Sequence, residues 1–237
     1  LQTPAAVVDL DVVERNTSRM AARCAALGVG LRPHVKTHKC APAARLQLGG
    51  QSGGLTVSTL AEARHLADAG FRDLVYAVPV GPRKLAAVGE VLPLLERLAL
   101  LVDHEATVAE VAAFAAARRR LLDCFLEVDC GGRRTGVRPE GDDAERLAAA
   151  IACSPWLELR GVLTHAGHAY ACRDRAQAAV VAAEERDVAV AVAQRLRAAK
   201  FLAQLVRDVA GIQRRKDQDI GIDWRDPLLG GDARVHA

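Results

Sequence analysis

Short apolar runs alternate with alanine-rich helical runs along most of this chain of 237 residues. Short runs bounded by turn residues are typical of buried strands, and longer periodic runs are typical of helices. Because consecutive parallel strands need a crossover helix between them, this alternation predicts an α/β fold with a parallel sheet. The predicted strands, in chain order, are Leu31–Cys40, Gly54–Thr59, Leu74–Pro79, Arg97–Val102, Leu122–Val128 and Leu159–His165.

Helices are predicted in the intervals between these runs. Thr3–Leu10 is itself strand-like, and Asp11 is the predicted cap of a helix that ends near Leu27. The remaining predicted helices are Ala41–Leu48, Leu60–Ala69, Lys84–Glu90, Glu105–Arg119, Ala144–Ala152 and Arg175–Ala199.

The composition is that of an ordinary globular protein, 51% hydrophobic and 26% charged, with a net charge of +3. Aromatic residues make up 3%, and the arginines are scattered, so we expect no nucleic-acid partner. No apolar run approaches the roughly 20 residues of a membrane span, and we expect no membrane partner and no signal peptide. The six cysteines lack CxxC spacing, which favours reduced thiols and a cytoplasmic protein.

Three groups of chemically active residues follow predicted strands. The first is LRPHVKTHKC, where Lys36 stands at the end of a strand-length run. Partly buried lysines can act as Schiff-base amines, because burial favours the neutral, nucleophilic form. A solvated basic turn, with His34 and His38 in ordinary hydrogen bonds, is the alternative interpretation.

The second group is EVDCGGRRTG, from Glu127 to Gly136, and the third is THAGHAY, from Thr164 to Tyr170. Glycines in the second group let the backbone approach a ligand closely. Histidines and a tyrosine in the third suit metal ligation, acid–base work or ring stacking. The alternative interpretation of both is a polar loop. No GxGxxG or Walker sequence occurs, so a nucleotide site has no support.

These three motifs, in this order, resemble those of the D-serine dehydratase and D-threonine aldolase family. Its members are fold-type III pyridoxal phosphate enzymes with an alanine racemase-like barrel. The resemblance covers Thr3 to about Ala199 and implies a (β/α)8 TIM-barrel-type domain that binds pyridoxal 5'-phosphate. It places the Schiff-base lysine at Lys36, not Lys39. It also implies that Arg134, His165 and Tyr170 lie near the cofactor.

The predicted barrel is incomplete at its C-terminal end. Six strands are found from the lysine run onward, where a closed barrel needs about eight. We therefore predict a barrel domain over residues 1–199 and a divergent tail over 200–237. The family uses zinc, whose C-terminal ligands are not found in this sequence. Unpaired strand edges predict self-association, as a homodimer, or low stability alone.

The resemblance implies an enzyme that acts on a small D-amino acid, with a D-serine dehydratase-like reaction giving pyruvate and ammonia. Lys36, freed by the incoming amine, is the expected base for the α-proton. A D-threonine aldolase or an amino-acid racemase that uses the same lysine is one alternative. An inactive, truncated barrel is the other.

Overall fold

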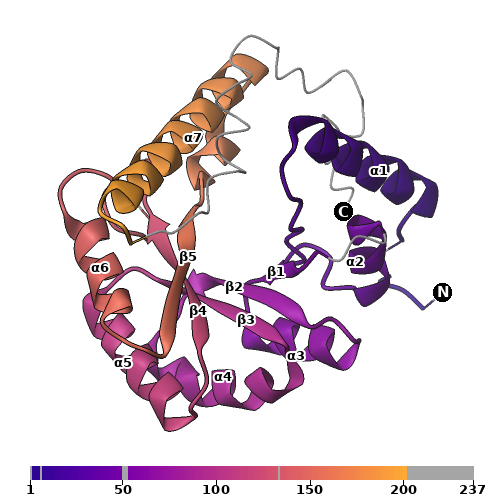
Figure 1. Cartoon of the computed structure of the whole chain (residues 1–237). Coiled ribbons are helices and arrows are strands. Elements are labelled where there is room, and N and C mark those ends of the chain that lie inside the picture. The colour runs from indigo at the N-terminus through magenta and orange to yellow at the C-terminus, as the bar shows by residue number, and fades with distance from the viewer. Residues whose placement is uncertain (1, 6, 50–52, 133, 202–237) are drawn as a thin grey trace.

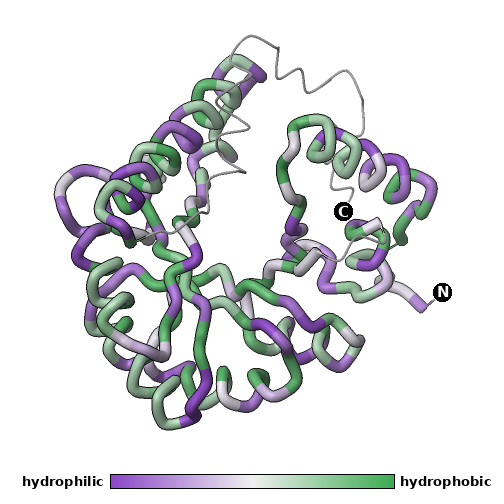
Figure 2. Tube along the Cα trace, in the orientation of Figure 1, coloured by the Kyte–Doolittle hydropathy of each residue, from purple (hydrophilic) through white to green (hydrophobic). Residues whose placement is uncertain are grey.

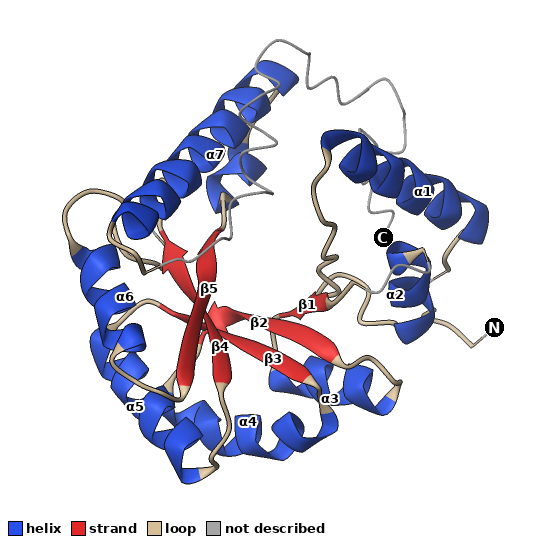
Figure 3. Cartoon of the chain, viewed as in Figure 1, coloured by secondary structure: helices blue, strands red, loops and turns tan. Residues whose placement is uncertain are grey.

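In the computed structural model, five parallel strands form a curved sheet with helices along its outer side (Figures 1 and 3). The structure describes residues 2–5, 7–49, 53–132 and 134–201, so the predicted tail lies outside the described residues from position 202 onward. The sheet order is β1-β2-β3-β4-β5, and every neighbouring pair is parallel. The strands are β1 (Leu55–Val57), β2 (Asp73–Pro79), β3 (Arg97–Val102), β4 (Leu122–Val128) and β5 (Leu157–Thr164).

Each strand leads into helical structure, as the alternating sequence predicted. The α-helices are α1 (Leu10–Leu27), α2 (Ala41–Leu48), α3 (Leu60–Asp68), α4 (Leu85–Val91), α5 (Glu105–Ala117), α6 (Asp143–Ala152) and α7 (Arg175–Ala198). Three short 3-10 helices are η1 (Pro82–Lys84), η2 (Leu92–Leu94) and η3 (Gly167–Ala171). Helices α1 and α2 lie beyond β1, whereas α7 packs beside β5 (Figure 1).

Two predictions near the N-terminus are wrong. The described residues between Thr3 and Asp9 form no strand, and the first helix begins at Leu10, with Asp9 and not Asp11 as its cap. The Asp9 carboxylate accepts a hydrogen bond from Val12 N (3.1 Å), which satisfies one free amide of the first turn. Asp11, one residue inside the helix, adds negative charge to the first turn.

The predicted strand Leu31–Cys40 is also wrong in extent. It forms one isolated bridge, between His34 and Thr56 of β1. Val35 N donates to Thr56 O, but the Val35 carbonyl accepts from His38 and Lys39, so the chain turns immediately after the bridge. The described part therefore has five strands, and the Leu31–Cys40 run contributes a bridge in place of a sixth.

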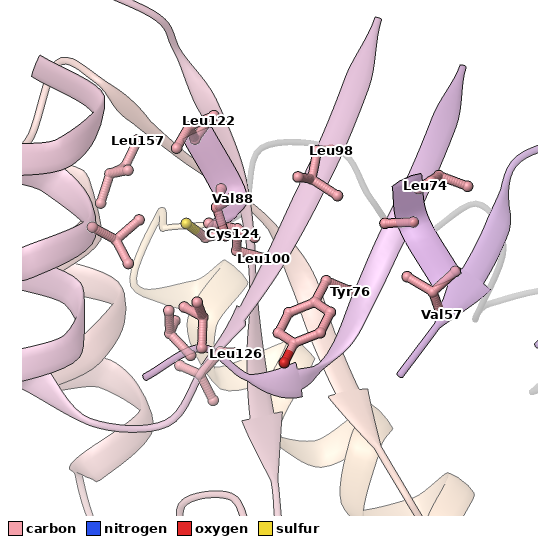
Figure 4. Packing of buried hydrophobic residues seen from close by; sticks show 14 of the residues in the cluster. Val57, Leu74, Tyr76, Val88, Leu98, Leu100, Leu122, Cys124, Leu126 and Leu157 are labelled. Carbon is pink, nitrogen blue, oxygen red and sulfur yellow. The ribbon is translucent and has the colours of Figure 1, made fainter. Parts of the chain in front are cut away.

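The hydrophobic core lies between the sheet and the outer helices. Alternate residues of β4, Cys124, Leu126 and Val128, are buried in it, as are Tyr76 of β2 and Val88 of α4 (Figure 4). Hydrophilic positions recur along the outer helices, including α7 (Figure 2). The period-2 alternation of a strand then sends the other residues of each strand to the inner face of the sheet.

Charged residues form a ladder across that inner face, at the amino ends of the strands. Arg32 donates two hydrogen bonds to the Asp73 carboxylate, one from each terminal guanidinium nitrogen (3.0 and 2.9 Å). Arg97 lies between Asp73 and Asp123, and Arg160 Nε is 3.7 Å from Asp123. The ladder joins Arg32, four residues before Lys36, to strands β2, β3, β4 and β5.

Asp123 is the carboxylate shared by Arg97 and Arg160, and its side chain is 15% exposed. Asp123→Asn is expected to lower the free energy of unfolding by about 1–3 kcal/mol, because two arginines lose a partly buried partner. Asp68→Asn is the matched control, since its i,i+4 pair with Arg64 is exposed and contributes at most about 0.5 kcal/mol. Urea unfolding measures both; equal losses would contradict the ladder's role.

Candidate functional site at the carboxyl ends of the strands

Lys36 lies in the turn that follows the His34–Thr56 bridge. Its backbone N–H donates to His34 Nδ1 (3.3 Å), and His34 Nε2 lies 3.2 Å from Ser58 Oγ. Because Nδ1 accepts from an amide, the ring carries its proton on Nε2 and donates it to Ser58. His34 therefore connects the Lys36 backbone to the end of β1.

Ser58 is fixed in turn by the start of α3. Its backbone N–H donates to Glu62 Oε2 (2.8 Å), and Glu62 also forms a capping box with Thr59. In a capping box, the side chain of the N-cap residue and the side chain three positions later each accept a hydrogen bond from the other residue's backbone N–H. The chain beside Lys36 is thus tied to a rigid helix terminus.

The second loop, between β4 and α6, is folded back against the end of its own strand. Asp129 N donates to Val137 O (2.9 Å), and Val137 N donates to Glu127 O (2.9 Å). The Asp129 side chain accepts from Gly131 N (2.9 Å), and Gly136 N donates to Asp103 at the end of β3 (3.3 Å). These bonds place Arg134 at the tip of a closed loop, where its side chain is exposed.

The third loop follows β5 and is held by a carboxylate from α7. Glu185 Oε1 accepts from Thr164 Oγ1 and from Ala166 N, both at 3.0 Å. His165, between these two residues, is half-buried. The ring of His168 lies against Gly131 and Gly132, so the second and third loops pack on each other.

The charges of two predicted site residues, Lys36 and Arg134, act on a third, His165. The positive charges of Arg134 and Lys36 both act on His165, and Lys36 and His165 both act on His34. The pKa of His165 lies below its ordinary value of 6.5, because of burial first and these two cations second. Burial and Lys36 lower the pKa of His34 in the same way. Both rings are therefore neutral near pH 7.

Tyr170 and Lys39 are placed less centrally. The Tyr170 ring lies edge-on to His165, with ring centroids 6.4 Å apart, but its side chain is 82% exposed. Lys39 Nζ pairs with Glu62 at 3.5 Å. Among the described residues, Lys36 forms no such ion pair, and it is the lysine whose charge acts on His165.

Several residues that build this site were not singled out from the sequence. Glu185 is about 20 positions from the loop it holds and carries no sequence signal for that contact. Glu127 did carry a sequence signal, because it is a charged residue within the apolar run LDCFLEV, where period-2 alternation places it on the inner face of the sheet. Ser58 is found only through the parallel pairing that brings β1 beside His34.

A lysine, neutral histidines and an arginine at the carboxyl ends of parallel strands define an α/β barrel-type protein with an amine-centred site. The sequence matches the family "Alanine racemase, N-terminal domain" over residues 8–211. The chain belongs to this family, the fold-type III pyridoxal phosphate proteins. Its fold is thus the α/β sheet of the pyridoxal phosphate barrels, as the motifs implied.

Among known proteins, the chain is similar to D-threo-3-hydroxyaspartate dehydratase of Delftia sp. (strain HT23). The two are 41% identical over 205 residues, which cover 84% of this chain and 52% of the relative. The crystal structure of that enzyme superposes with a TM-score of 0.79 at 36% identity, covering 89% of this chain and 57% of that one.

D-serine dehydratase of Dictyostelium discoideum is 30% identical over 79% of this chain and 50% of the relative. The structure of D-threonine aldolase from Filomicrobium marinum superposes with a TM-score of 0.78 at 31% identity, covering 86% of this chain and 54% of that one. The chain spans about half the length of the relatives it matches.

The donor set at this site fits pyridoxal phosphate. The cofactor carries an aldehyde, which an unpaired amine such as Lys36 can hold, and anionic oxygens, which a guanidinium such as Arg134 can bind. A neutral His165, on which both charges act, presents a ring that can lie against the cofactor without adding charge. Among the described residues, no three histidine, cysteine or carboxylate side chains are grouped so that they could hold a metal ion.

Gly136 is required by the closure of the second loop. Its φ is 97°, and a Cβ there would lie 2.7 Å from Asp129 N and 2.8 Å from the Val128 carbonyl carbon. Gly136→Ala is expected to lower the free energy of unfolding by about 1–3 kcal/mol. Gly141→Ala is the control, because its φ is 82° but no atom lies within 4 Å of the added carbon. Urea unfolding compares them; equal losses would show that the close backbone approach is not what requires glycine.

The histidine environment predicts a measurable titration. We expect the His165 ring to titrate below pH 6.5, and the midpoint to rise in Arg134→Gln, which removes one cation that opposes protonation. Because the folded pKa lies below the unfolded one, the stabilisation from the neutral ring is present above pH 6.5 and is lost as pH falls. NMR of the ring Cε1–H measures the midpoint; an unchanged value in Arg134→Gln would contradict this geometry.

Proposed function

We propose that this chain is the cofactor-binding part of a pyridoxal phosphate enzyme that acts on D-amino acids with a β-hydroxyl group. The observation that carries the proposal is that Lys36, Arg134 and His165 all lie in the segments that follow the carboxyl ends of the parallel pairing, where the charges of Lys36 and Arg134 act on His165. The names of the relatives support the substrate class, since they include a D-serine dehydratase and a D-threo-3-hydroxyaspartate dehydratase.

Lys36 is the proposed attachment point and the proposed base. Its Nζ would hold the cofactor aldehyde, and as a free amine it would take the α-proton of the substrate. When bound, the cofactor supplies an electron sink for the charge that develops at the substrate α-carbon. The hydrogen bond from Lys36 N to His34 Nδ1 holds the turn from which the Lys36 side chain extends.

Arg134 and His165 are the proposed cofactor contacts, with Tyr170 at the rim. Arg134 provides a permanent positive charge for an anionic oxygen of the cofactor. His165, held neutral and anchored through Glu185, provides a planar surface. Tyr170 lies edge-on to that ring and is exposed, so its proposed role is a contact made when ligand covers the site.

A second candidate function is that of an aldolase. The match to the D-threonine aldolase structure favours it, because the same lysine site would serve cleavage of the Cα–Cβ bond. Product analysis separates the two reactions: elimination from D-serine releases ammonia and pyruvate, whereas cleavage of D-threonine releases glycine. An amino-acid racemase would instead exchange the α-proton with solvent and release neither product.

We further propose that residues 1–199 form the cofactor-binding domain and 200–237 a distinct tail. Helix α7 ends at Ala198, next to the proposed boundary, and the family match covers residues 8–211. Helix α1 has no buried residue, and exposes Leu10 and Met20; this supports association with a second copy as a homodimer. No helix in the described residues is long and apolar enough to cross a membrane. We propose a cytoplasmic location, which is consistent with the free cysteines.

The test of Lys36 is covalent trapping of the cofactor. After incubation with pyridoxal phosphate and reduction with borohydride, peptide mass mapping is expected to find the adduct on Lys36. Lys36→Ala is expected to lose the adduct and the near-visible absorbance band. Lys39→Ala is the matched control, three residues away in the same turn, and should retain both.

Two outcomes would contradict this proposal. An adduct of equal yield in Lys36→Ala would show that another amine holds the cofactor. Absence of an adduct in the unmodified protein would show that this chain does not hold the cofactor covalently, and would favour an inactive barrel.

A further inference from the structure

The hydroxyl of Ser58 lies against the ring of His34, just beyond the carboxyl end of β1. Ser58 Oγ is 3.2 Å from His34 Nε2, and Lys36 N donates to the other ring nitrogen, Nδ1, at 3.3 Å. A neutral imidazole carries one proton, and a ring nitrogen that accepts from an amide does not hold it. The proton is therefore on Nε2, so the His34 ring donates and Ser58 Oγ accepts.

This direction leaves the hydroxyl proton of Ser58 unused by the protein. A serine hydroxyl has one proton to donate, and among the described residues no acceptor receives it. The neighbouring Glu62 carboxylate has other partners. Its Oε2 accepts from the backbone N–H groups of Ser58 and Thr59, and its Oε1 pairs with Lys39 Nζ. The Ser58 proton is thus left for water or for a ligand.

The strand pairing places this hydroxyl on the inner face of the sheet. Val35 and Val57 are both fully buried in the core between the sheet and the helices. Period-2 alternation sends His34, one residue before Val35, and Ser58, one residue after Val57, to the opposite face. The contact between the two side chains agrees with this placement. Ser58 is half-buried, so the hydroxyl is open to the inner face.

The charges at this end of the sheet indicate what kind of atom accepts the proton. The charge of Lys36 acts on the His34 ring and, with Arg134, on His165. A hydroxyl donor beside a cation is complementary to an oxygen that carries negative charge, and hydrogen bonds to charged oxygens are the stronger kind. Such an oxygen has two possible sources at this site, the cofactor and the carboxylate of an amino-acid substrate.

We propose that Ser58 donates its hydroxyl proton to a negatively charged oxygen of the ligand bound at Lys36, and that His34 is the positioning residue that fixes this direction. The hydrogen bonds run one way, from the Lys36 amide to His34, from His34 to Ser58, and from Ser58 to the ligand. Since a backbone amide starts the series, the hydroxyl cannot turn back to donate to the neutral ring. The ligand part of this inference rests on the proposed function.

The first test needs no cofactor. Long-range ¹H–¹⁵N NMR spectra distinguish the two neutral tautomers of a histidine, and they are recorded above pH 6.5, where the His34 ring is neutral. We expect the proton on Nε2. Ser58→Ala is expected to keep this tautomer and the amide shift of Lys36, because Lys36 N still donates to Nδ1. A proton on Nδ1 in the unmodified protein would overturn the proposal, because Ser58 would then donate to the ring.

The second test measures affinity by absorbance, first for pyridoxal phosphate and then for D-alanine added to the cofactor-loaded protein. D-Alanine has no β-hydroxyl to expel, so its binding is seen without elimination. Ser58→Ala is expected to weaken one of the two about tenfold, the effect of one charge-assisted hydrogen bond. Ser154→Ala is the matched control and is expected to change neither. Its Oγ also accepts a hydrogen bond, from Trp156 N (3.2 Å), but it precedes the amino end of β5.

The two affinities identify the source of the oxygen. Weaker binding of pyridoxal phosphate assigns the acceptor to the cofactor, and weaker binding of D-alanine alone assigns it to the substrate carboxylate. Unchanged affinity for both in a folded Ser58→Ala would overturn the proposal. A loss of affinity together with a shifted Lys36 amide in cofactor-free Ser58→Ala would also overturn it, because the hydroxyl would then act only through the turn.

Failure of the proposed function gives a different result. If the unmodified protein binds no pyridoxal phosphate, the proposed function fails, and the ligand part of this inference fails with it. The tautomer of His34 in the cofactor-free protein still decides whether the ring donates to Ser58.

Discussion

The inner face of this sheet carries charged side chains, and the fold depends on keeping them paired. At the amino ends of the strands, Asp73 and Asp123 each lie between two arginines, and the resulting ladder connects the Lys36 segment to β5. Charges that are partly removed from water must find partners within the protein. The ladder does this across neighbouring strands and so fixes their relative positions.

The carboxyl ends of the same strands have a different arrangement of charge. There Lys36 and Arg134 act together on His165, and both neighbouring histidine rings have a lowered pKa. Neutral histidine rings add no charge of their own, so the charges of Lys36 and Arg134 can act on an anionic ligand. The two ends of the sheet thus separate stability from chemistry, as in other barrels built from parallel strands.

The loops reach the site because each is held by contacts from a different element. Glu185 of α7 holds the third loop, Asp103 at the end of β3 holds the second, and Glu62 of α3 holds the end of β1 beside Lys36. In each case a carboxylate accepts from a backbone amide, a bond that fixes a loop without requiring regular structure. The site is therefore as rigid as the helices and strands behind it.

The sequence by itself determined the alternation of strands and helices and the placement of EVDCGGRRTG and THAGHAY at strand ends, because these depend on local patterns. It did not determine the strand-to-turn change after Val35, which is decided by hydrogen bonds from His38 and Lys39. Nor did it assign the partners of Glu127, His34 and Glu185. Such contacts join residues on separate elements, and only the tertiary structure sets which of them meet.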